Sequence, residues 1–389
     1  MSTMQELLAT DSSTTELSWN GKPLSEVLVV ASVPIFFDWF LGPHIAMLKD
    51  LDLAPTIMTN TKPERISIGT FVKAPFARSP KDVPALLRSL LALRREIAKR
   101  CTGDNALMIH LHTPLAATLG RIAVPAKYRD DVCVVYTAHG FHFLPGENTP
   151  FARIERVLAK RTDLLMTMNS DDTSSAESFT SEGRPKVVEL PGIGCQRAVS
   201  SVSKKESNAE KQGPTIIAVG MLENNKRPQL AIQSFAASGV DGTLKFFGEG
   251  PLLAELQQLC IDEGVEDRVE FVGFVSDLRA AYAEADCMLF LSGREGLPMA
   301  VVEGVAAGLP VVAFDIRGVR DILRNLDDWF QPKSIDPADV AKAINEAVTC
   351  SPNVDQLTER ASRFSVEASV KTHRSALLDL LGATGRNDP

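Results

Sequence analysis

Two glutamates, Glu295 and Glu303, stand eight positions apart in a segment that is otherwise mostly apolar. Glu303 carries the only charge between Glu295 and Asp315. A lone carboxylate among apolar neighbours is costly to bury, so Glu303 needs a partner. The two hydroxyls of a ribose would suit it. An ion pair with Arg294 or Arg317 is the structural alternative.

The residues between these glutamates predict an anion-binding site. The sequence indicates a strand at 287–292, a loop, and then a helix that Pro298 opens and Gly308 closes. Gly296 and Leu297 would then present free backbone N–H groups at the N-terminus of that helix. Helix N-termini bind phosphate and carboxylate groups well.

Two basic residues follow the first expected strand of the same half. Gly220 ends the strand at 215–220, and Lys226 and Arg227 come just before a helix that begins near Pro228. At the carboxyl edge of a parallel sheet, both side chains could meet a phosphate charge. A solvated surface pair is the alternative.

The elements that must position these residues alternate between strand and helix throughout the chain. Short, nearly continuous apolar strands between helices predict α/β folding, with parallel sheets covered on both faces. The polar segment 196–213 is typical of a linker between two doubly wound, Rossmann-like domains facing a cleft, at 26–195 and 214–365, after a flexible N-terminus at 1–25. The expected strands are 27–32, 56–59, 107–112, 132–137, 164–169 and 186–190, then 215–220, 244–248, 269–273, 287–292 and 310–314.

Composition excludes several classes of protein. The chain has 389 residues, of which 44% are hydrophobic and 23% charged, as in globular proteins rather than disordered or fibrous ones. A net charge of −8 argues against general binding to nucleic acid. The six cysteines lack zinc or redox spacing, and the longest apolar run, 27–37, is too short to span a bilayer. A cytoplasmic location is therefore expected.

Histidines mark the corresponding edge of the first half. His139 and His142 follow the expected strand at 132–137, where ligands of open sheets bind. A structural role is the alternative for both. His110 and His112 alternate on a strand like core polar groups, although the turn after 112 could let His112 reach the cleft. No carboxylate or cysteine shares the spacing of these histidines, so no metal site is expected.

The segment 73–100 is strongly basic, with eight Lys or Arg against two acids. Its helical part combines an apolar stripe with Arg88, Arg94 and Arg95 elsewhere around the helix. One interpretation is a solvated basic face, and the other is contact with anionic lipid headgroups or the diphosphate of a lipid acceptor. Aromatic residues at 36–40 are expected to form an apolar surface at the same edge.

Taken together, these motifs resemble the family-4 glycosyltransferases, retaining enzymes with the GT-B fold. The resemblance covers roughly residues 26–382. Two further segments, ARSP (77–80) and HLHTPLAATLGR (110–121), resemble the bacterial capsular and exopolysaccharide branch, which extends polyprenyl-diphosphate-linked sugars. The matching segments are VVYTAHGFHF (134–143), TDLLMTMNSDD (162–172), ELPGIG (189–194), IIAVGMLENNK (216–226), FFGEGP (246–251) and REGLPMAVVEGVAAGLPVV (294–312).

The resemblance implies a hexosyltransferase that moves a sugar from a nucleoside-diphosphate sugar, with UDP the expected carrier, to a lipid-linked or saccharide acceptor. It implies no cofactor, no metal, peripheral contact with the inner face of the cell membrane, and a last helix at 366–389 that crosses back onto the first domain. The implied catalytic residues are His139 and Glu295. The implied donor-binding residues are Gly220, Lys226, Arg227, Phe274, Gly296, Leu297, Pro298, Met299 and Glu303, and the implied acceptor-side residues are Arg78, Phe141 and His142.

Two departures from the family pattern stand out. Met221 occupies the place where most members have arginine, and Arg227 or Arg294 could substitute for it. The segment 32–40 lacks the glycine-rich turn that many members carry after the first strand. A sugar-nucleotide epimerase or phosphorylase on the same fold, and a non-catalytic sugar-nucleotide-binding protein, are the alternative functions.

Overall fold

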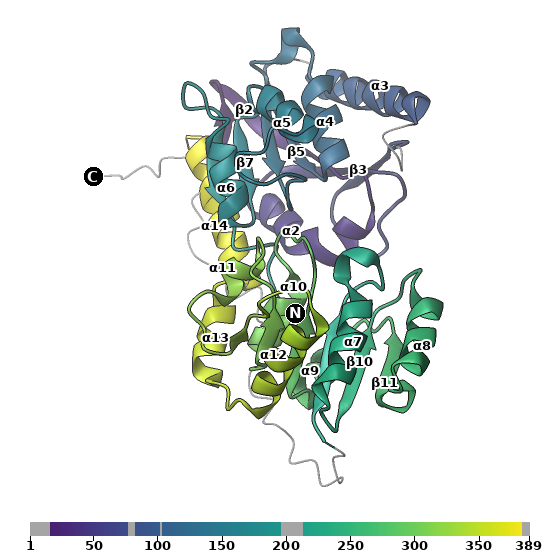
Figure 1. Ribbon diagram of the computed structural model, residues 1–389. Coiled ribbons are helices and arrows are strands. Elements are labelled where there is room, and N and C mark those ends of the chain that lie inside the picture. The colour runs from purple at the N-terminus through teal and green to yellow at the C-terminus, as the bar shows by residue number, and fades with distance from the viewer. Residues whose placement is uncertain (1–15, 77–81, 102, 196–212, 383–389) are drawn as a thin grey trace, which may run out of the picture.

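A computed structural model describes residues 16–76, 82–101, 103–195 and 213–382. It contains two sheets, each sandwiched between helices, stacked one above the other (Figure 1). This arrangement confirms the predicted pair of doubly wound parallel sheets. The predicted linker at 196–213 lies almost wholly outside the described residues, as does Arg78.

The first sheet has the strand order β4-β3-β2-β5-β6-β7-β8 and is parallel except for β1, which pairs antiparallel with β2. Helices α3 (Val83–Arg100), α4 (Pro114–Ala123), α5 (Pro150–Ala159) and α6 (Ser170–Glu177) pack on one face. The other face is covered by the π-helical turn η1 (Phe37–Leu41), α2 (Gly42–Asp50) and α14 (Val366–Leu380). The strands are β1 (Ser18–Trp19), β2 (Lys22–Val30), β3 (Ala54–Thr59), β4 (Thr70–Lys73), β5 (Ala106–His112), β6 (Val132–Thr137), β7 (Leu164–Thr167) and β8 (Lys186–Glu189).

The expectation of a flexible segment at 1–25 is wrong for residues 16–25. They form β1 and the beginning of β2, because Leu17, Trp19 and Leu24 are buried against the sheet. The edge strand β4 was also not predicted from the sequence. Its side chains are only half-buried or exposed, so it lacks the continuous apolar signal of the central strands.

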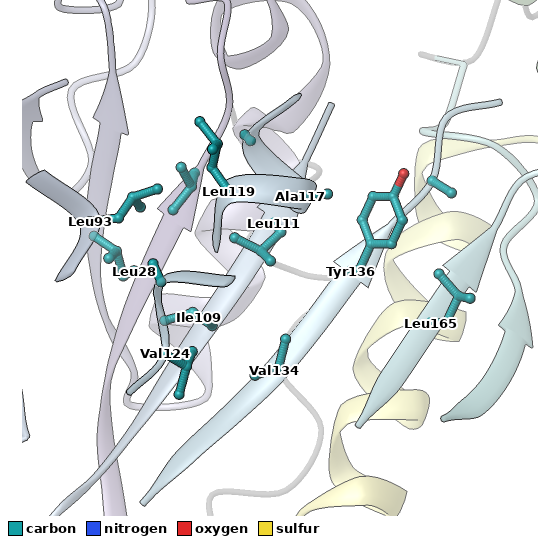
Figure 2. Close-up of a cluster of buried hydrophobic side chains, with 14 of the residues drawn as sticks. Leu28, Leu93, Ile109, Leu111, Ala117, Leu119, Val124, Val134, Tyr136 and Leu165 are labelled. Atoms are coloured by element: carbon teal, nitrogen blue, oxygen red, sulfur yellow. The ribbon is translucent and has the colours of Figure 1, made fainter. Parts of the chain in front are cut away.

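The hydrophobic core around the first sheet explains why its central strands have continuous apolar sequences. Figure 2 shows Ile109, Val134 and Leu165, from the neighbouring strands β5, β6 and β7, lying in one buried layer. Leu93 of α3 and Leu119 of α4 pack over them. A second cluster covers the opposite face, so the central strands are apolar on both sides, as expected for a parallel sheet.

The second sheet has the order β11-β10-β9-β12-β13-β14 and is entirely parallel. Helices α7 (Pro228–Ser238), α8 (Leu253–Asp262) and α12 (Pro337–Thr349) cover one face. The other carries α9 (Arg279–Glu284), α10 (Met299–Ala306), α11 (Val319–Leu323) and α13 (Val354–Ser362). Its strands are β9 (Thr215–Val219), β10 (Thr243–Phe247), β11 (Val269–Gly273), β12 (Cys287–Phe290), β13 (Val311–Ala313) and β14 (Trp329–Phe330).

The chain passes from the second half back to the first at the start of α14. The backbone N–H of Cys195 donates to the carbonyl of Phe364 at 2.8 Å, and the N–H of Val366 donates to the carbonyl of Cys195 at 3.1 Å. Beyond this junction α14 lies beside α2 of the first half, where Ala376 and Leu377 are buried.

A buried guanidinium also joins the two halves. Arg317, in the loop after β13, is 5% exposed and donates to Asp172 Oδ1 of α6 at 2.8 Å. It donates as well to the backbone carbonyls of Phe141 at 2.6 Å and Phe143 at 2.9 Å. Its Nε donates to the carbonyl of Glu295 at 3.0 Å. One side chain therefore fixes the loops that follow β6, β12 and β13 against one another.

Glycines permit the close approach of these loops. A Cβ on Gly296 would lie 1.8 Å from the carbonyl oxygen of His139, and a Cβ on Gly318 would lie 2.0 Å from the carbonyl oxygen of Gly296. Gly318 also has a φ of +76°, which disfavours any residue with a side chain. The backbones of these loops are in direct contact, so no residue other than glycine fits at Gly296 or Gly318 unless the loops move.

Five histidines form a continuous group on the α2 and α14 side of the first sheet, in which His139 is half-buried and the other four are buried. The His44 Nε2–H donates to the carbonyl of Ile193 at 3.1 Å, so the His44 Nδ1 accepts from His373 Nδ1 at 2.9 Å. Burial lowers the pKa of every ring in the group, to about 3 for His110 and His139. The group comprises His44, His110, His112, His139 and His373.

We predict that this group makes the fold sensitive to acid. The ordinary histidine pKa is about 6.5, so the unfolded chain binds more protons than the folded one between that value and the lowered folded pKa values. The contribution of these rings to the free energy of unfolding is therefore fully present above the unfolded pKa, and it decreases as the pH falls through this window. Chemical unfolding at a series of pH values should show this fall, and His373→Leu should make it shallower by about 1.4 kcal/mol per pH unit. An identical pH dependence in wild type and His373→Leu would contradict the prediction.

Candidate active site

Glu303 lies on α10 at the edge of a cavity of about 470 Å³ between the two halves. Its Oε2 accepts a hydrogen bond from the Tyr282 hydroxyl of α9 at 3.0 Å. Burial raises the pKa of the Glu303 carboxyl, and the Tyr282 bond opposes this effect. Among the described residues, no Lys or Arg forms an ion pair with Glu303. The structural alternative, an ion pair with Arg294 or Arg317, is absent because Arg317 joins Asp172 instead and Arg294 faces a different cavity.

Both halves contribute walls to the cavity at Glu303. The first half supplies Trp39 and Arg65, whose guanidinium carbon lies 3.6 Å from the Trp39 ring centroid. The second half supplies Met299 of α10 and residues just before α9. Phe274 lies beside the cavity, with its ring edge-on to Trp39 at 5.9 Å. A half-buried carboxylate beside aromatic rings suits a ligand with hydroxyl donors and a flat ring.

Glu295 and Lys226 meet at the carboxyl edge of the second sheet. Lys226 Nζ lies 2.5 Å from Glu295 Oε1, and both side chains are partly exposed. Lys226 ends the short turn η3 (Asn224–Lys226) and packs beside Gly220, where β9 ends. An anionic ligand could draw Lys226 away and leave the Glu295 carboxylate to accept hydrogen bonds from hydroxyl groups.

The loop from Glu295 to α10 has the predicted form with one small correction. Pro298 is the N-cap of α10, and the helix begins at Met299. Within the described residues, the backbone N–H groups of Gly296, Leu297 and Met299 have no hydrogen-bond acceptor. They are therefore available to an anion at the positive end of α10.

Arg227 faces this loop as well. Its backbone is left-handed, with φ 53° and ψ 49°, immediately before α7. Its guanidinium lies 5.3 Å from the Phe314 ring, and a Cβ on Gly293 would be 3.1 Å from its Nη2. Met221 is exposed, and its uncharged side chain cannot pair with a phosphate. Of the two arginines considered as substitutes at Met221, Arg227 has its guanidinium beside Gly293, whereas the Arg294 side chain lines a different cavity.

His139 follows β6 and faces the same region from the first half. Its Nε2 lies 3.1 Å from His112 Nδ1, and its ring meets Phe36 at 4.7 Å. The aromatic residues at 36–40 do not form one apolar surface beside α3, because η1 lies on the opposite face of the sheet. Phe37 is buried in the core, whereas Trp39 and Phe40 line the cavity at Glu303.

A second cavity, of about 1050 Å³, opens on the other side of the histidine loop. Most of its lining is apolar and comes from the N-terminal ends of α3, α4 and α5 and from the loop after β2. His142 and Phe141 line it, and the Phe141 ring stacks on Phe143 at 4.8 Å. Arg294, next to Glu295, is the contribution of the second half to this lining.

Four residues of the site had no functional role in the sequence analysis. Tyr282 bonds Glu303, and Arg317 and Asp172 join the loops. Asn169 donates to the Gly296 carbonyl at 3.0 Å and to Asp172 at 2.9 Å. Asn169 and Asp172 belong to the quoted segment 162–172. Their position just after a strand, at the carboxyl edge of the sheet, was the signal that could have found them.

Across the residues that the structure describes, no group of three or more His, Cys, Asp or Glu is arranged to hold a metal ion. In the same ranges, no helix has the length and apolar character needed to cross a membrane.

Comparison with known proteins finds that the chain is similar to sugar-transferring enzymes. Residues 200–364 match the family described as glycosyl transferases group 1. The Bacillus subtilis (strain 168) protein EpsD, named as a glycosyltransferase, is 29% identical over 82% of this chain and 87% of its own length. An Escherichia coli UDP-Gal:alpha-D-GlcNAc-diphosphoundecaprenol alpha-1,3-galactosyltransferase is 24% identical over 63% of this chain and 66% of its own.

The fold has solved counterparts. The lipopolysaccharide outer core galactosyltransferase WaaB superposes with a TM-score of 0.68 at 13% identity, over 91% of this chain and 99% of its own. At that identity the likeness concerns the fold, which is the predicted GT-B arrangement. With the family match over the second half and the glycosyltransferase relatives over most of the chain, these findings identify the protein as a glycosyltransferase with the GT-B fold.

Proposed function

We propose that this enzyme transfers a sugar, with retention of configuration, from a UDP-sugar to a lipid-linked saccharide in surface polysaccharide biosynthesis. The observation that carries the proposal is the large, mostly apolar cavity beside the loop of Glu295. The E. coli relative is named for a UDP-galactose donor and a diphosphoundecaprenol-linked acceptor, which supports both substrate classes.

The donor would bind at the second sheet. Glu303, held by Tyr282, accepts hydrogen bonds from the ribose hydroxyls, with the base beside Phe274. Lys226 and Arg227 meet the diphosphate together with the free N–H groups at the start of α10. Positive side chains and the helix dipole supply the phosphate charge balance, so we propose transfer without a metal ion.

Glu295 and His139 would hold the transferred sugar from opposite sides of the cleft. In a same-face displacement, the bond from the anomeric carbon to the phosphate oxygen breaks while the acceptor oxygen bonds to that carbon. The acceptor proton passes to an oxygen of the departing phosphate. Retaining glycosidases need a second carboxylate as the nucleophile, at about 5 Å from the acid, and this scheme does not.

The acceptor would enter through the large cavity. Its apolar lining suits the hydrocarbon of a polyprenyl group, while Arg294 and His142 stand at the end of the cavity nearest the donor loop. Both can meet an acceptor diphosphate there. Arg78, implied by the resemblance as an acceptor-side residue, lies outside the described residues.

The outer surface of α3 supports contact with an anionic bilayer. Leu87 and Leu91 are 56% and 51% exposed, so part of the apolar surface of α3 faces away from the core. Arg88, Arg94 and Arg95 are exposed around them. Bases interleaved with exposed leucines favour membrane contact over a merely solvated basic face.

Helix α5 presents a similar surface and packs on the same face of the sheet (Figure 1). Phe151, Ile154 and Val157 are 54%, 43% and 66% exposed, and Arg153 and Lys160 are exposed among them. The large cavity lies between these helices. A lipid acceptor could pass from a bilayer at this surface into the cavity.

The acidic residues of these two helices do not oppose such contact. Glu96 is half-buried and paired with Arg100, and Glu155 is buried and paired with Arg121 at 2.8 Å. No exposed carboxylate remains on the helical span of either α3 or α5, both of which are described in full. We propose that α3 and α5 together form the membrane-facing surface.

The alternative enzyme, an epimerase or phosphorylase on the same fold, and a non-catalytic binding protein are not favoured by the glycosyltransferase relatives. Mass spectrometry of products tests the proposal. Incubation with a panel of UDP-sugars and a polyprenyl-diphosphate-linked saccharide should yield a lipid product one sugar heavier, and EDTA should not abolish it. Epimerised donor without transfer would contradict the proposed transferase activity. Activity that returns only with a divalent metal would contradict transfer without a metal ion.

Glu303 and Glu295 should fail in different ways when replaced. Charge-assisted hydrogen bonds contribute about 1.5–3 kcal/mol each, so Glu303→Ala should bind UDP and UDP-sugar much more weakly. Glu295→Ala should bind UDP nearly as well as wild type and lose turnover instead, because it holds only the transferred sugar. Calorimetric titration with UDP measures the difference. Wild-type UDP affinity in folded Glu303→Ala would refute the ribose assignment.

The basic face of α3 should strengthen membrane binding. Each base near an anionic surface contributes about 1 kcal/mol, so replacing Arg88, Arg94 and Arg95 together with Gln should weaken binding to anionic vesicles by roughly two orders of magnitude. Activity on lipid acceptors should fall and UDP affinity should not change. Vesicle sedimentation measures the binding. Equal sedimentation of variant and wild type would mean that the basic face of α3 is solvated and does not contact the membrane.

The apolar face of α5 provides a second, independent variant. Replacing Phe151, Ile154 and Val157 with Ser should weaken vesicle binding even at high salt, because the lost contribution is apolar. Ile261→Ser, which alters a similarly exposed residue on α8 of the other half, is the control and should bind vesicles like wild type.

A further inference from the structure

His139 is held by another histidine rather than by a carboxylate or a backbone carbonyl. His112 is the last residue of β5 and pairs in register with Thr137 at the end of β6. Two residues later, His139 turns back so that its Nε2 lies 3.1 Å from His112 Nδ1. The two rings are nearly parallel, at an interplanar angle of 28°.

This contact restricts the protonation of both rings. Burial keeps both imidazoles neutral, and a neutral imidazole has one donor and one acceptor nitrogen. In the pair, one nitrogen must donate and the other must accept, so the tautomer of His112 determines that of His139. His139 Nδ1 has no hydrogen-bond partner among the described residues and is therefore available to a ligand.

The neighbouring His110 offers a natural comparison. It lies two residues earlier on the same strand, is equally buried, and its ring is 4.2 Å from that of His112. However, its Nε2 bonds the Thr137 hydroxyl at 2.8 Å and makes no contact with His139 nitrogens. The two histidines thus share environment and strand but differ in whether they touch His139.

We propose that His112 is a positioning residue that fixes the orientation and tautomer of His139, so that His139 Nδ1 is presented to the donor sugar. The inference rests on the proposed role of His139 in sugar transfer. It gives the alternating His110 and His112 different functions, one structural and one acting through His139.

Turnover kinetics of three variants test the proposal. His112→Leu removes the hydrogen bond at similar volume and should lower kcat by up to about 100-fold, because misplacement of a catalytic group has effects of that order. UDP affinity should stay within about twofold of wild type, since UDP binds the other half. His112→Asn places an amide nitrogen or oxygen near the position of Nδ1 and should recover most of the turnover. His110→Leu is the matched control and should keep near-wild-type kcat.

A double-mutant cycle separates the inference from the proposed function. His112→Leu should cause no further loss of kcat in a His139→Ala background, because the two residues act as one unit. If His139→Ala is impaired but His112→Leu behaves like His110→Leu, the positioning role is wrong and the proposed function stands. If His139→Ala turns over like wild type, both the role of His139 and the inference fail.

Discussion

The geometry of the active site depends on one buried guanidinium. Arg317 bonds Asp172, the carbonyls of Phe141 and Phe143, and the carbonyl of Glu295. A buried ion pair of this kind is expensive to break, because removing one partner leaves an uncompensated charge and costs about 3–5 kcal/mol. The loop of Glu295 and the loop after His139 are therefore held at a fixed separation, and the glycines at their contact make that separation small.

This fixed contact divides the space between the halves into two different environments. On one side, the cavity at Glu303 is about 470 Å³ and combines a carboxylate, a tyrosine hydroxyl and aromatic rings. On the other, the cavity among α3, α4 and α5 is more than twice as large and mostly apolar. His139 and Glu295 lie at the boundary. A polar donor and a lipid-linked acceptor would approach the same point from opposite sides, which is the arrangement that group transfer requires.

Much of the fold was predictable because the central strands are buried on both faces and so read as continuous apolar runs. The short strands β1, β4 and β14 were missed, since edge position and length deprive them of that signal. Glu303 was identifiable as a lone charge in an apolar helix. Its partner was not, because Tyr282 reaches it only through the packing of α9 against α10.

The sequence also did not predict the direction in which some side chains point. The sequence of α3 shows an apolar stripe and several bases, but it does not show that Leu87 and Leu91 lie on the surface. That depends on how α4 fills the space beneath α3. In the same way, the aromatic residues at 36–40 were expected beside α3. The π-helical turn η1 directs Trp39 and Phe40 into the cavity at Glu303 instead.

A crystal structure of the enzyme with UDP and a short-chain prenyl-diphosphate-linked sugar would show where both substrates bind. We expect the ribose hydroxyls on Glu303, the UDP diphosphate at Lys226 in place of its ion pair with Glu295, and the prenyl chain in the cavity among α3, α4 and α5. A prenyl chain bound elsewhere, or UDP bound with the ribose away from Glu303, would contradict this expectation.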